Sequence, residues 1–238
     1  MSVLRILHLY PRELGINGDA GNVLALAERA RWRGIEAEVV SHAPGGELPA
    51  SADIVHIGSG PLSAQRAVHA DVLSIADRLR DWRDAGVPIL AIAGGWQLLG
   101  RELVTPEGET LAGAGVFPSR AVLGAARHVG EIVVRSTELG SLAGFENHSA
   151  RTELEGGEPL GRVLSGTGND GASEGVTVGA SIGTHLHGPV LPMNPVLADR
   201  LLATALRAEL PAVPQTERVD RYATNARRAI AERLGVSL

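Results

Sequence analysis

The segment Val87–Gly100, VPILAIAGGWQLLG, has the pattern of a strand that turns sharply into a helix. An apolar run ends at Ala93, two glycines follow, and a helix-like pattern begins at Trp96. Enzymes use such a turn as a nucleophile elbow. The reactive side chain stands at the end of the strand, and the next backbone N–H faces the developing oxyanion. Because Ala93 carries only a methyl group, the segment predicts a reactive geometry without its reactive atom.

Two other groups of residues allow a chemical interpretation but support it weakly. The Gly58–Gly60 loop could cradle a phosphate, but the sequence after it has no Lys and no Gly-Lys-Ser/Thr motif. Glu146, His148 and His187 could be metal ligands, but their spacing matches no standard metal site. We therefore expect no nucleotide, no metal ion and no other cofactor.

The elements that must position the elbow alternate between strands and helices. Apolar runs predict strands over residues 3–9, 35–40, 52–57 and 87–92, and helical spacing predicts helices over 23–33, 63–82 and 96–103. This alternation predicts a three-layer α/β fold, flavodoxin-like, with a mostly parallel sheet flanked by helices. The loops 10–21, 58–61 and 93–95 then meet at the carboxyl edge of the sheet, where such sheets place ligands.

The second half of the chain has shorter strand-like runs and ends in helices. Strands are predicted over 111–116, 129–135, 162–165 and 175–182, with a polar segment at 144–148. Asn194 before Pro195 opens an amphipathic helix over 195–210, and an Arg- and Glu-rich helix follows over 216–234. We interpret residues 1–210 as one domain. Residues 211–238 form a helical tail that is either a solvated face or a partner-docking segment.

Composition narrows the classes of protein further. The chain has 238 residues, 44% of them hydrophobic, and a formal net charge of -5, with no basic tract that predicts nucleic-acid binding. The first apolar run is too short for a signal peptide or a membrane span, so we expect a cytoplasmic protein without membrane insertion. The chain has no Cys, which excludes disulfides, thiolate metal sites and Cys catalysis.

A series of short motifs runs in order from about residue 5 to residue 207. The motifs are Leu9-Tyr10-Pro11, Gly18-Asp19-Ala20-Gly21-Asn22, Gly58-Ser59-Gly60 with Gln65, the run 94–100, Gly144-Phe145-Glu146-Asn147-His148 with Arg151-Thr152, Gly168-Asn169-Asp170-Gly171, the run 183–189 and the run 191–195. In this order they resemble class I (triad) glutamine amidotransferases of the cobyric-acid-synthase-like type. Within that family they are most similar to the GatD type of glutaminase subunit.

The resemblance implies a chemistry and a set of site residues. In this family a Cys at the elbow attacks the glutamine carboxamide, a His activates the thiol, and the released ammonia passes to a synthetase partner. The implied catalytic positions are Ala93, His187 and Asp19, although Asp19 is equally well read as a helix cap, and His187 could be a structural turn residue. The implied oxyanion donors are Gly94, Gly58, Ser59 and Gly60, and the implied substrate-binding residues are Arg127 and Gln97.

The resemblance also implies a partner. GatD-type subunits form a heterodimer with a MurT-like Mur ligase that amidates D-glutamate of lipid II in peptidoglycan synthesis, with L-glutamine as the nitrogen source. This sequence departs from the family pattern at three positions: Ala93 replaces the Cys, Ser59 replaces the middle glycine of a triple-glycine loop, and Trp96 replaces a Tyr. Loss of a nucleophile typically lowers the rate by about 10⁶-fold, so the chain as given is expected to be inactive in glutamine hydrolysis.

Two main functions stay open on this basis, beside a weaker third in which His187 and Asp19 activate water for a different hydrolysis. The chain is either a GatD-like glutaminase subunit with a disabled nucleophile, or a natural pseudo-glutaminase that regulates or scaffolds a Mur-ligase-like protein. Ala93 itself has two explanations, a deliberate Cys→Ala change and a natural loss. The changes at Ser59 and Trp96 and the absence of any Cys favour the natural loss.

Overall fold

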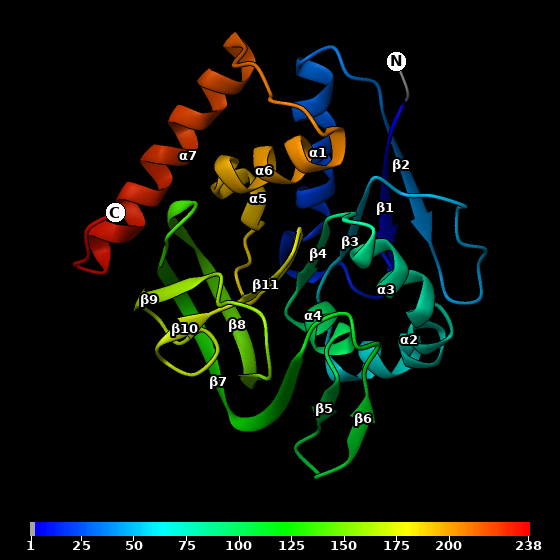
Figure 1. The fold of residues 1–238 in the computed structure, drawn as a ribbon. Helices are drawn as coiled ribbons and strands as arrows, with labels where there is room; N and C mark the ends of the chain where they lie inside the picture. Colours follow the sequence, from blue (N-terminus) through cyan, green and yellow to red (C-terminus); the bar gives the residue numbers. More distant parts are fainter. Residues whose placement is uncertain (1–2) are drawn as a thin grey trace.

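A mostly parallel sheet forms the centre of the molecule in the computed structural model, which describes residues 3–238 (Figure 1). Its order is β11 (Val176–Val178), β12 (Ser181–Thr184), β4 (Ile89–Ile92), β3 (Ile54–Ile57), β1 (Leu4–Leu9) and β2 (Ala37–His42). Only β11 and β12 pair antiparallel. The predicted α/β fold is confirmed.

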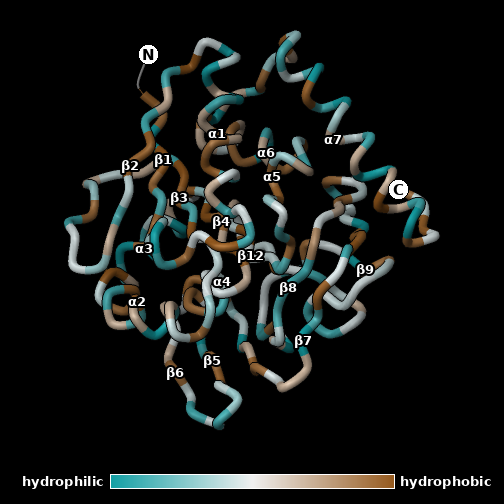
Figure 2. Tube along the Cα trace, turned by 180° about the vertical axis from the view of Figure 1, so that it is seen from behind, coloured by the Kyte–Doolittle hydropathy of each residue, from teal (hydrophilic) through white to brown (hydrophobic). Residues whose placement is uncertain are grey.

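Helices cover both faces of this sheet because its strands are apolar on both sides. Leu4 and Ile6 of β1 lie in one core, and Leu7 and Leu9 lie in the other. The first core is closed by α1 (Ala20–Trp32), α5 (Val190–Met193) and α6 (Pro195–Leu206), and the second by α2 (Leu62–Ser74), α3 (Ala76–Asp84) and α4 (Gly94–Leu99). Figure 2 shows the hydrophobic colour gathered along the central strands. Each buried aliphatic side chain stabilises this packing by about 1.5–3 kcal/mol.

A second, mostly antiparallel sheet lies beside the first. Its order is β10 (Ser173–Glu174), β9 (Gly161–Ser165), β7 (Ser119–Ser136), β5 (Glu102–Val104) and β6 (Thr110–Ala112), and β8 (Gly140–Leu154) pairs with β7. Only β5 and β7 run parallel. The long β7–β8 hairpin carries polar residues on its exposed positions, which hides the strand period in the sequence.

Several of the predicted elements are wrong in their extent, among them the strand expected over 111–116, which is only Thr110–Ala112. The helix expected over 96–103 ends at Leu99 and is followed by strand β5. The polar segment 144–148 lies inside β8. The helix expected over 63–82 is two helices, because Ile75 leaves the helical conformation at φ -100° and ψ 3°. The strand expected over 175–182 is a hairpin, because Gly179 turns the chain at φ 57°.

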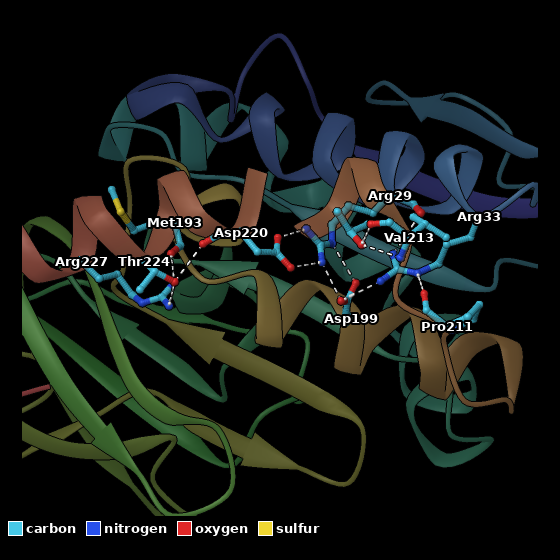
Figure 3. Close-up of polar contacts among 10 residues, drawn as sticks. Arg29, Arg33, Met193, Asp199, Pro211, Val213, Asp220, Thr224 and Arg227 are labelled. Atoms are coloured by element: carbon cyan, nitrogen blue, oxygen red, sulfur yellow. Dashed lines mark hydrogen bonds and ion pairs between the residues drawn. The ribbon is translucent and has the colours of Figure 1, made fainter. Parts of the chain in front are cut away.

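The C-terminal helix α7 (Pro214–Arg233) packs back onto the domain. Its Ile230 and Ala231 contact Val133 and Ala143 of the β7–β8 hairpin. At the other end of the helix, a buried arginine of α1 joins α7 to α6 (Figure 3). None of the helices formed within residues 3–238 is both long and apolar enough to cross a membrane.

That arginine is Arg29, and every nitrogen of its guanidinium is bonded. Its Nε and Nη2 donate to the two carboxylate oxygens of Asp199 at 2.7 and 2.6 Å, and its Nη1 donates to Asp220 at 2.6 Å. Arg33 donates to the same Asp199 at 2.9 Å and to the carbonyl of Pro211 at 3.0 Å. Burial lowers the pKa of Arg29, but the bonds to the two carboxylates outweigh it and raise the pKa.

Candidate functional site

The sharp turn that the sequence predicts is present, and the structure shows that its backbone is strained at Ala93. Ala93 lies between β4 and α4 with φ 39° and ψ -101°, a region that non-glycine residues rarely adopt. The two glycines after it are required by close packing. A Cβ at Gly94 would lie 2.9 Å from the carbonyl oxygen of Gly60, and one at Gly95 would lie 2.4 Å from that of Gly58. The glycine loop therefore lies directly against the elbow.

His187 and Asp19 come together from opposite ends of the chain. Nδ1 of His187 lies 3.3 Å from Oδ1 of Asp19, and both side chains are buried. Asp19 sits at the N-cap position of α1 but makes no capping bond, so its carboxylate is directed to the imidazole instead. Backbone hydrogen bonds with Phe145 hold His187 on both sides, at 2.7 and 3.2 Å. Nε2 of His187 is buried and has no partner among the described residues.

The predicted oxyanion loop joins these two parts. The second carboxylate oxygen of Asp19 accepts a hydrogen bond from the Ser59 N–H at 2.8 Å, and the Ser59 hydroxyl accepts one from the Gly94 N–H at 3.3 Å. The carbonyl of Gly60 accepts from Gln65 at 3.2 Å. The three loops that were predicted to meet at the carboxyl edge of the sheet therefore do so. The oxyanion role of their backbone amides stays a prediction.

A cavity of about 200 Å³ opens beside the elbow. Its lining includes Ala93, Gly94, Ser59, Gln97 and Arg127. The cavity thus gathers both predicted substrate-binding residues at the elbow. Its size and its mixture of polar and apolar atoms suit one small polar molecule.

The polar residues of the cavity are held by neighbours that the sequence did not single out as site residues. Nε of Arg127 donates to Asn147 at 2.7 Å, and Asn147 donates in turn to Asn17 at 3.3 Å. Gln97 accepts a hydrogen bond from Gln65 at 3.0 Å. Asn147 and Gln65 do stand in the quoted motifs, but spacing alone did not reveal which side chains they position. The register shift of the β7–β8 hairpin lies between Leu123 and His128, next to Arg127.

A buried wall of histidines lies behind the cavity. His148 lines the cavity and stacks on His185, with ring centroids 4.0 Å apart, and His185 in turn contacts Trp96. Burial and the neighbouring imidazoles lower the pKa of His185 well below its usual value. Glu174 accepts hydrogen bonds from the hydroxyl of Thr184 and the N–H of His185, and burial raises its pKa to about 7. His185 is therefore neutral at neutral pH, and the carboxyl of Glu174 is close to half protonated there.

The three residues considered as a metal trio do not form one. Glu146 lies 3.4 Å from His148 and accepts hydrogen bonds from the backbone amides of residues 167 and 168, whereas His187 pairs with Asp19. Within residues 3–238, no group of three or more His, Asp or Glu side chains has a metal-binding arrangement.

Comparisons with known proteins place this geometry in a family. The chain matches the CobB/CobQ-like glutamine amidotransferase domain over residues 5–195. It is 36% identical over 208 residues to the lipid II isoglutaminyl synthase (glutamine-hydrolyzing) subunit GatD of Staphylococcus aureus, covering 86% of this chain and 85% of that protein. It is 34% identical over 212 residues to the subunit of the same name from Streptococcus pneumoniae, covering 86% and 81%. It is 32% identical to the cobyric acid synthase of Desulforudis audaxviator, but it spans only 34% of that protein.

Solved structures support the fold. A glutamine amidotransferase crystal structure matches with a TM-score of 0.59 and 21% identity, covering 84% of this chain and 98% of that chain. The structure of PurLQS from Thermotoga maritima matches with a TM-score of 0.52 and 14% identity, covering 87% and 97%.

Proposed function

This chain belongs to the CobB/CobQ-like glutamine amidotransferase domain family, and we propose that it is a GatD-like subunit whose glutamine site cannot hydrolyse glutamine. In this proposal, the chain forms a heterodimer with a MurT-like Mur ligase that amidates D-glutamate of lipid II. The identity to two GatD subunits over most of their length supports this assignment. A cytoplasmic location remains part of the proposal.

The single observation that carries the proposal is the retained geometry around a missing thiol. The chain has a strained elbow at Ala93 and a buried His187–Asp19 pair in which Nε2 of His187 has no partner within residues 3–238, and Ser59 links the two parts through its bonds with Asp19 and Gly94. A base that is oriented by a carboxylate and has a free ring nitrogen is what an attacking thiol requires. The base and the elbow are therefore both present in this chain, and the sulfur atom is absent.

The remaining cavity is suited to bind glutamine intact. The guanidinium of Arg127 lies at the cavity, where it would pair with the α-carboxylate of the amino acid. The amide of Gln97 lies at the same cavity and offers polar atoms to the ligand. With Ala93 at the elbow, the carboxamide carbon of the ligand meets a methyl group. Binding would then proceed without the covalent step.

The C-terminal helix is the part of the chain that we propose for docking the ligase. Its inner residues pack on the domain, whereas its outer face exposes Arg218, Arg221, Tyr222 and Arg228. An exposed aromatic residue among arginines is a composition that is enriched at protein interfaces. Residues 211–238 therefore act in the proposal as a docking segment fixed to the 1–210 domain.

A second function, that of a purely regulatory or scaffolding subunit, follows from the same alanine. Because the chain contains no Cys, no other residue can supply the thiol. In that case the ligase would use free ammonia, and this chain would change the activity or stability of the ligase without donating nitrogen. The two functions differ in whether glutamine occupies the cavity.

Coexpression with a MurT-like ligase from the same genome tests the proposal. We expect a stable complex in which ammonium chloride, but not glutamine, supports amidation of lipid II, as measured by mass spectrometry. Isothermal titration of the complex with glutamine should show binding, and Arg127→Ala should weaken it by about 10- to 100-fold, the effect of losing one or two charged hydrogen bonds. Arg151→Ala is the matched control, because Arg151 is an exposed arginine on β8 outside this cavity.

Each outcome distinguishes the functions. A complex without glutamine binding would support the purely regulatory function. Glutamine-dependent amidation by the unaltered chain would contradict the assignment of a disabled site. Failure to form any complex would contradict the assignment of the partner.

A further inference from the structure

The Ser59 hydroxyl accepts a hydrogen bond from the Gly94 N–H, the backbone donor that directly follows the elbow residue Ala93. The Gly94 N–H donates to the Ser59 hydroxyl oxygen at 3.3 Å, and Ser59 is only 5% exposed. The N–H of Ser59 itself is bonded to Asp19 at 2.8 Å, and its carbonyl accepts from the N–H of Ile16 at 3.2 Å. The serine is therefore fixed through its backbone on both sides, with its hydroxyl against Gly94.

This contact matters because Gly94 is the donor that an elbow uses for the oxyanion. When a nucleophile adds to a carboxamide, the carbonyl oxygen takes the negative charge and needs N–H donors about 2.7–3.1 Å away. Here the hydroxyl oxygen of Ser59 lies where that oxygen would accept from Gly94. A glycine at position 59 would leave the position open, since it has no side chain.

We infer that Ser59 is a second, independent block in the site, because it withdraws the Gly94 N–H from oxyanion stabilisation. The inference rests on the proposed function, since it assumes that the cavity takes glutamine. With Ser59 in place, the cavity can bind glutamine itself but does not stabilise the tetrahedral intermediate that forms during hydrolysis. Restoring the thiol alone would consequently leave hydrolysis slow.

The test restores the thiol first alone and then together with a free Gly94 N–H. In the complex with the ligase, Ala93→Cys supplies a thiol that gives its proton to His187 and attacks the carboxamide carbon, so that a C–S bond forms and the C–N bond then breaks. Ammonia leaves with a proton from His187, and water then cleaves the thioester to glutamate. Removing one oxyanion donor costs about 10²–10³ in kcat. We therefore expect Ala93→Cys/Ser59→Gly to hydrolyse glutamine at least about 100-fold faster than Ala93→Cys, with KM changed by less than about threefold.

Two further variants separate the hydroxyl from general effects of the substitution. Ala93→Cys/Ser59→Ala keeps the Cβ and removes only the oxygen, so it should also exceed Ala93→Cys. Ala93→Cys/Ser63→Gly is the matched control, because Ser63 is exposed on α2, and it should equal Ala93→Cys. Labelling by a diazoketone analogue of glutamine, followed by intact mass, provides a second readout, since the introduced thiol is the only one in the chain.

The outcomes separate this inference from the proposed function. Equal rates for Ala93→Cys and Ala93→Cys/Ser59→Gly, whether fast or undetectable, overturn the role of Ser59. If those equal rates are accompanied by glutamine binding to the unaltered complex, the proposed function stands alone. If the unaltered complex binds no glutamine, the proposed ligand fails as well.

Discussion

The Arg29 network and the His187 site both contain buried polar groups, but only those of the Arg29 network all have hydrogen-bond partners. Arg29 is 4% exposed, and its guanidinium is fully paired with the carboxylates of Asp199 and Asp220. At the site, the buried Nε2 of His187 and Oε1 of Gln65 have no partners among the described residues, and Ala93 keeps a strained backbone. One region is satisfied within the fold, whereas the other leaves groups unpaired.

This difference indicates what each region serves. A buried polar group without a partner costs about 1–3 kcal/mol, and a strained backbone residue costs a similar amount. Folding alone gives no reason to keep the free Gln65 oxygen and the strained Ala93 together at one small cavity, whereas a ligand that pairs with the free atom does. The site is therefore organised for a molecule from outside, and the Arg29 network is organised for α7.

The largest expected effect tests the satisfied region. Arg29→Met leaves Asp220 without its cation and Asp199 with Arg33 alone, and breaking a buried pair in this way costs about 3–5 kcal/mol of unfolding free energy. Urea unfolding should show this loss, and proteolysis should cut α7 free of the domain first. Arg101→Met is the control, because Arg101 is 57% exposed and pairs with Glu155 on the surface, where the cost is at most about 1 kcal/mol. Equal losses in the two variants would remove the contrast between the regions.

The second prediction concerns Glu174, which belongs to the unsatisfied region because its Oε2 has no partner among residues 3–238. Burial raises its pKa from 4.5 to about 7 in the folded protein, so the folded state holds a proton that the unfolded state loses above pH 4.5. The free energy of unfolding therefore decreases by about 1.4 kcal/mol for each pH unit as the pH rises from about 4.5 to 7. The total loss over this range is about 3 kcal/mol. Because Glu174→Gln stays neutral, its free energy of unfolding relative to that of the wild type should rise by the same amount between pH 4.5 and 7.

Paired urea titrations at pH 4.5, 6 and 8 measure the difference between the two proteins. Taking the difference removes the opposite trend of the neighbouring His185, whose lowered pKa costs stability as pH falls below about 6.5. Glu153→Gln is the control, because Glu153 is half-exposed on β8, and its difference from the wild type should stay flat. A flat difference for Glu174→Gln would show that the carboxyl is ionised in the fold at acidic pH.

Sequence patterns predict the buried parallel sheet better than they predict the contacts within the site. Apolar runs and helical spacing were sufficient for the parallel sheet and its loops, because both faces of that sheet are buried. The β7–β8 hairpin was largely missed, since one of its faces is exposed and its polar residues break the apolar runs. The elbow and the meeting of Asp19 with the glycine loop were predictable from strand polarity. The bond between Ser59 and Gly94 was not, because it depends on a side-chain orientation that spacing does not encode.

The smallest expected effect tests whether the site still stores strain. Ala93 has φ 39°, which a glycine adopts without the steric cost of a Cβ, so Ala93→Gly relieves about 1–3 kcal/mol. The change also removes one buried methyl group, worth about 0.8 kcal/mol, and gives the unfolded chain more freedom, worth about 0.4–1 kcal/mol. The variant should therefore be more stable than the wild type by about 0.5 kcal/mol.

Ala91→Gly is the matched control, two residues earlier in β4. Ala91 is also buried and lies in a regular strand. Glycine there loses the buried methyl group and gives the unfolded chain more freedom, but it relieves no strain, so it should destabilise the protein by about 1–2 kcal/mol. The sign of the difference between the two variants is thus a direct measure of strain at the elbow. If Ala93→Gly destabilises the protein as much as Ala91→Gly, the elbow has relaxed, and the unpaired groups around His187 are the only cost that the site retains.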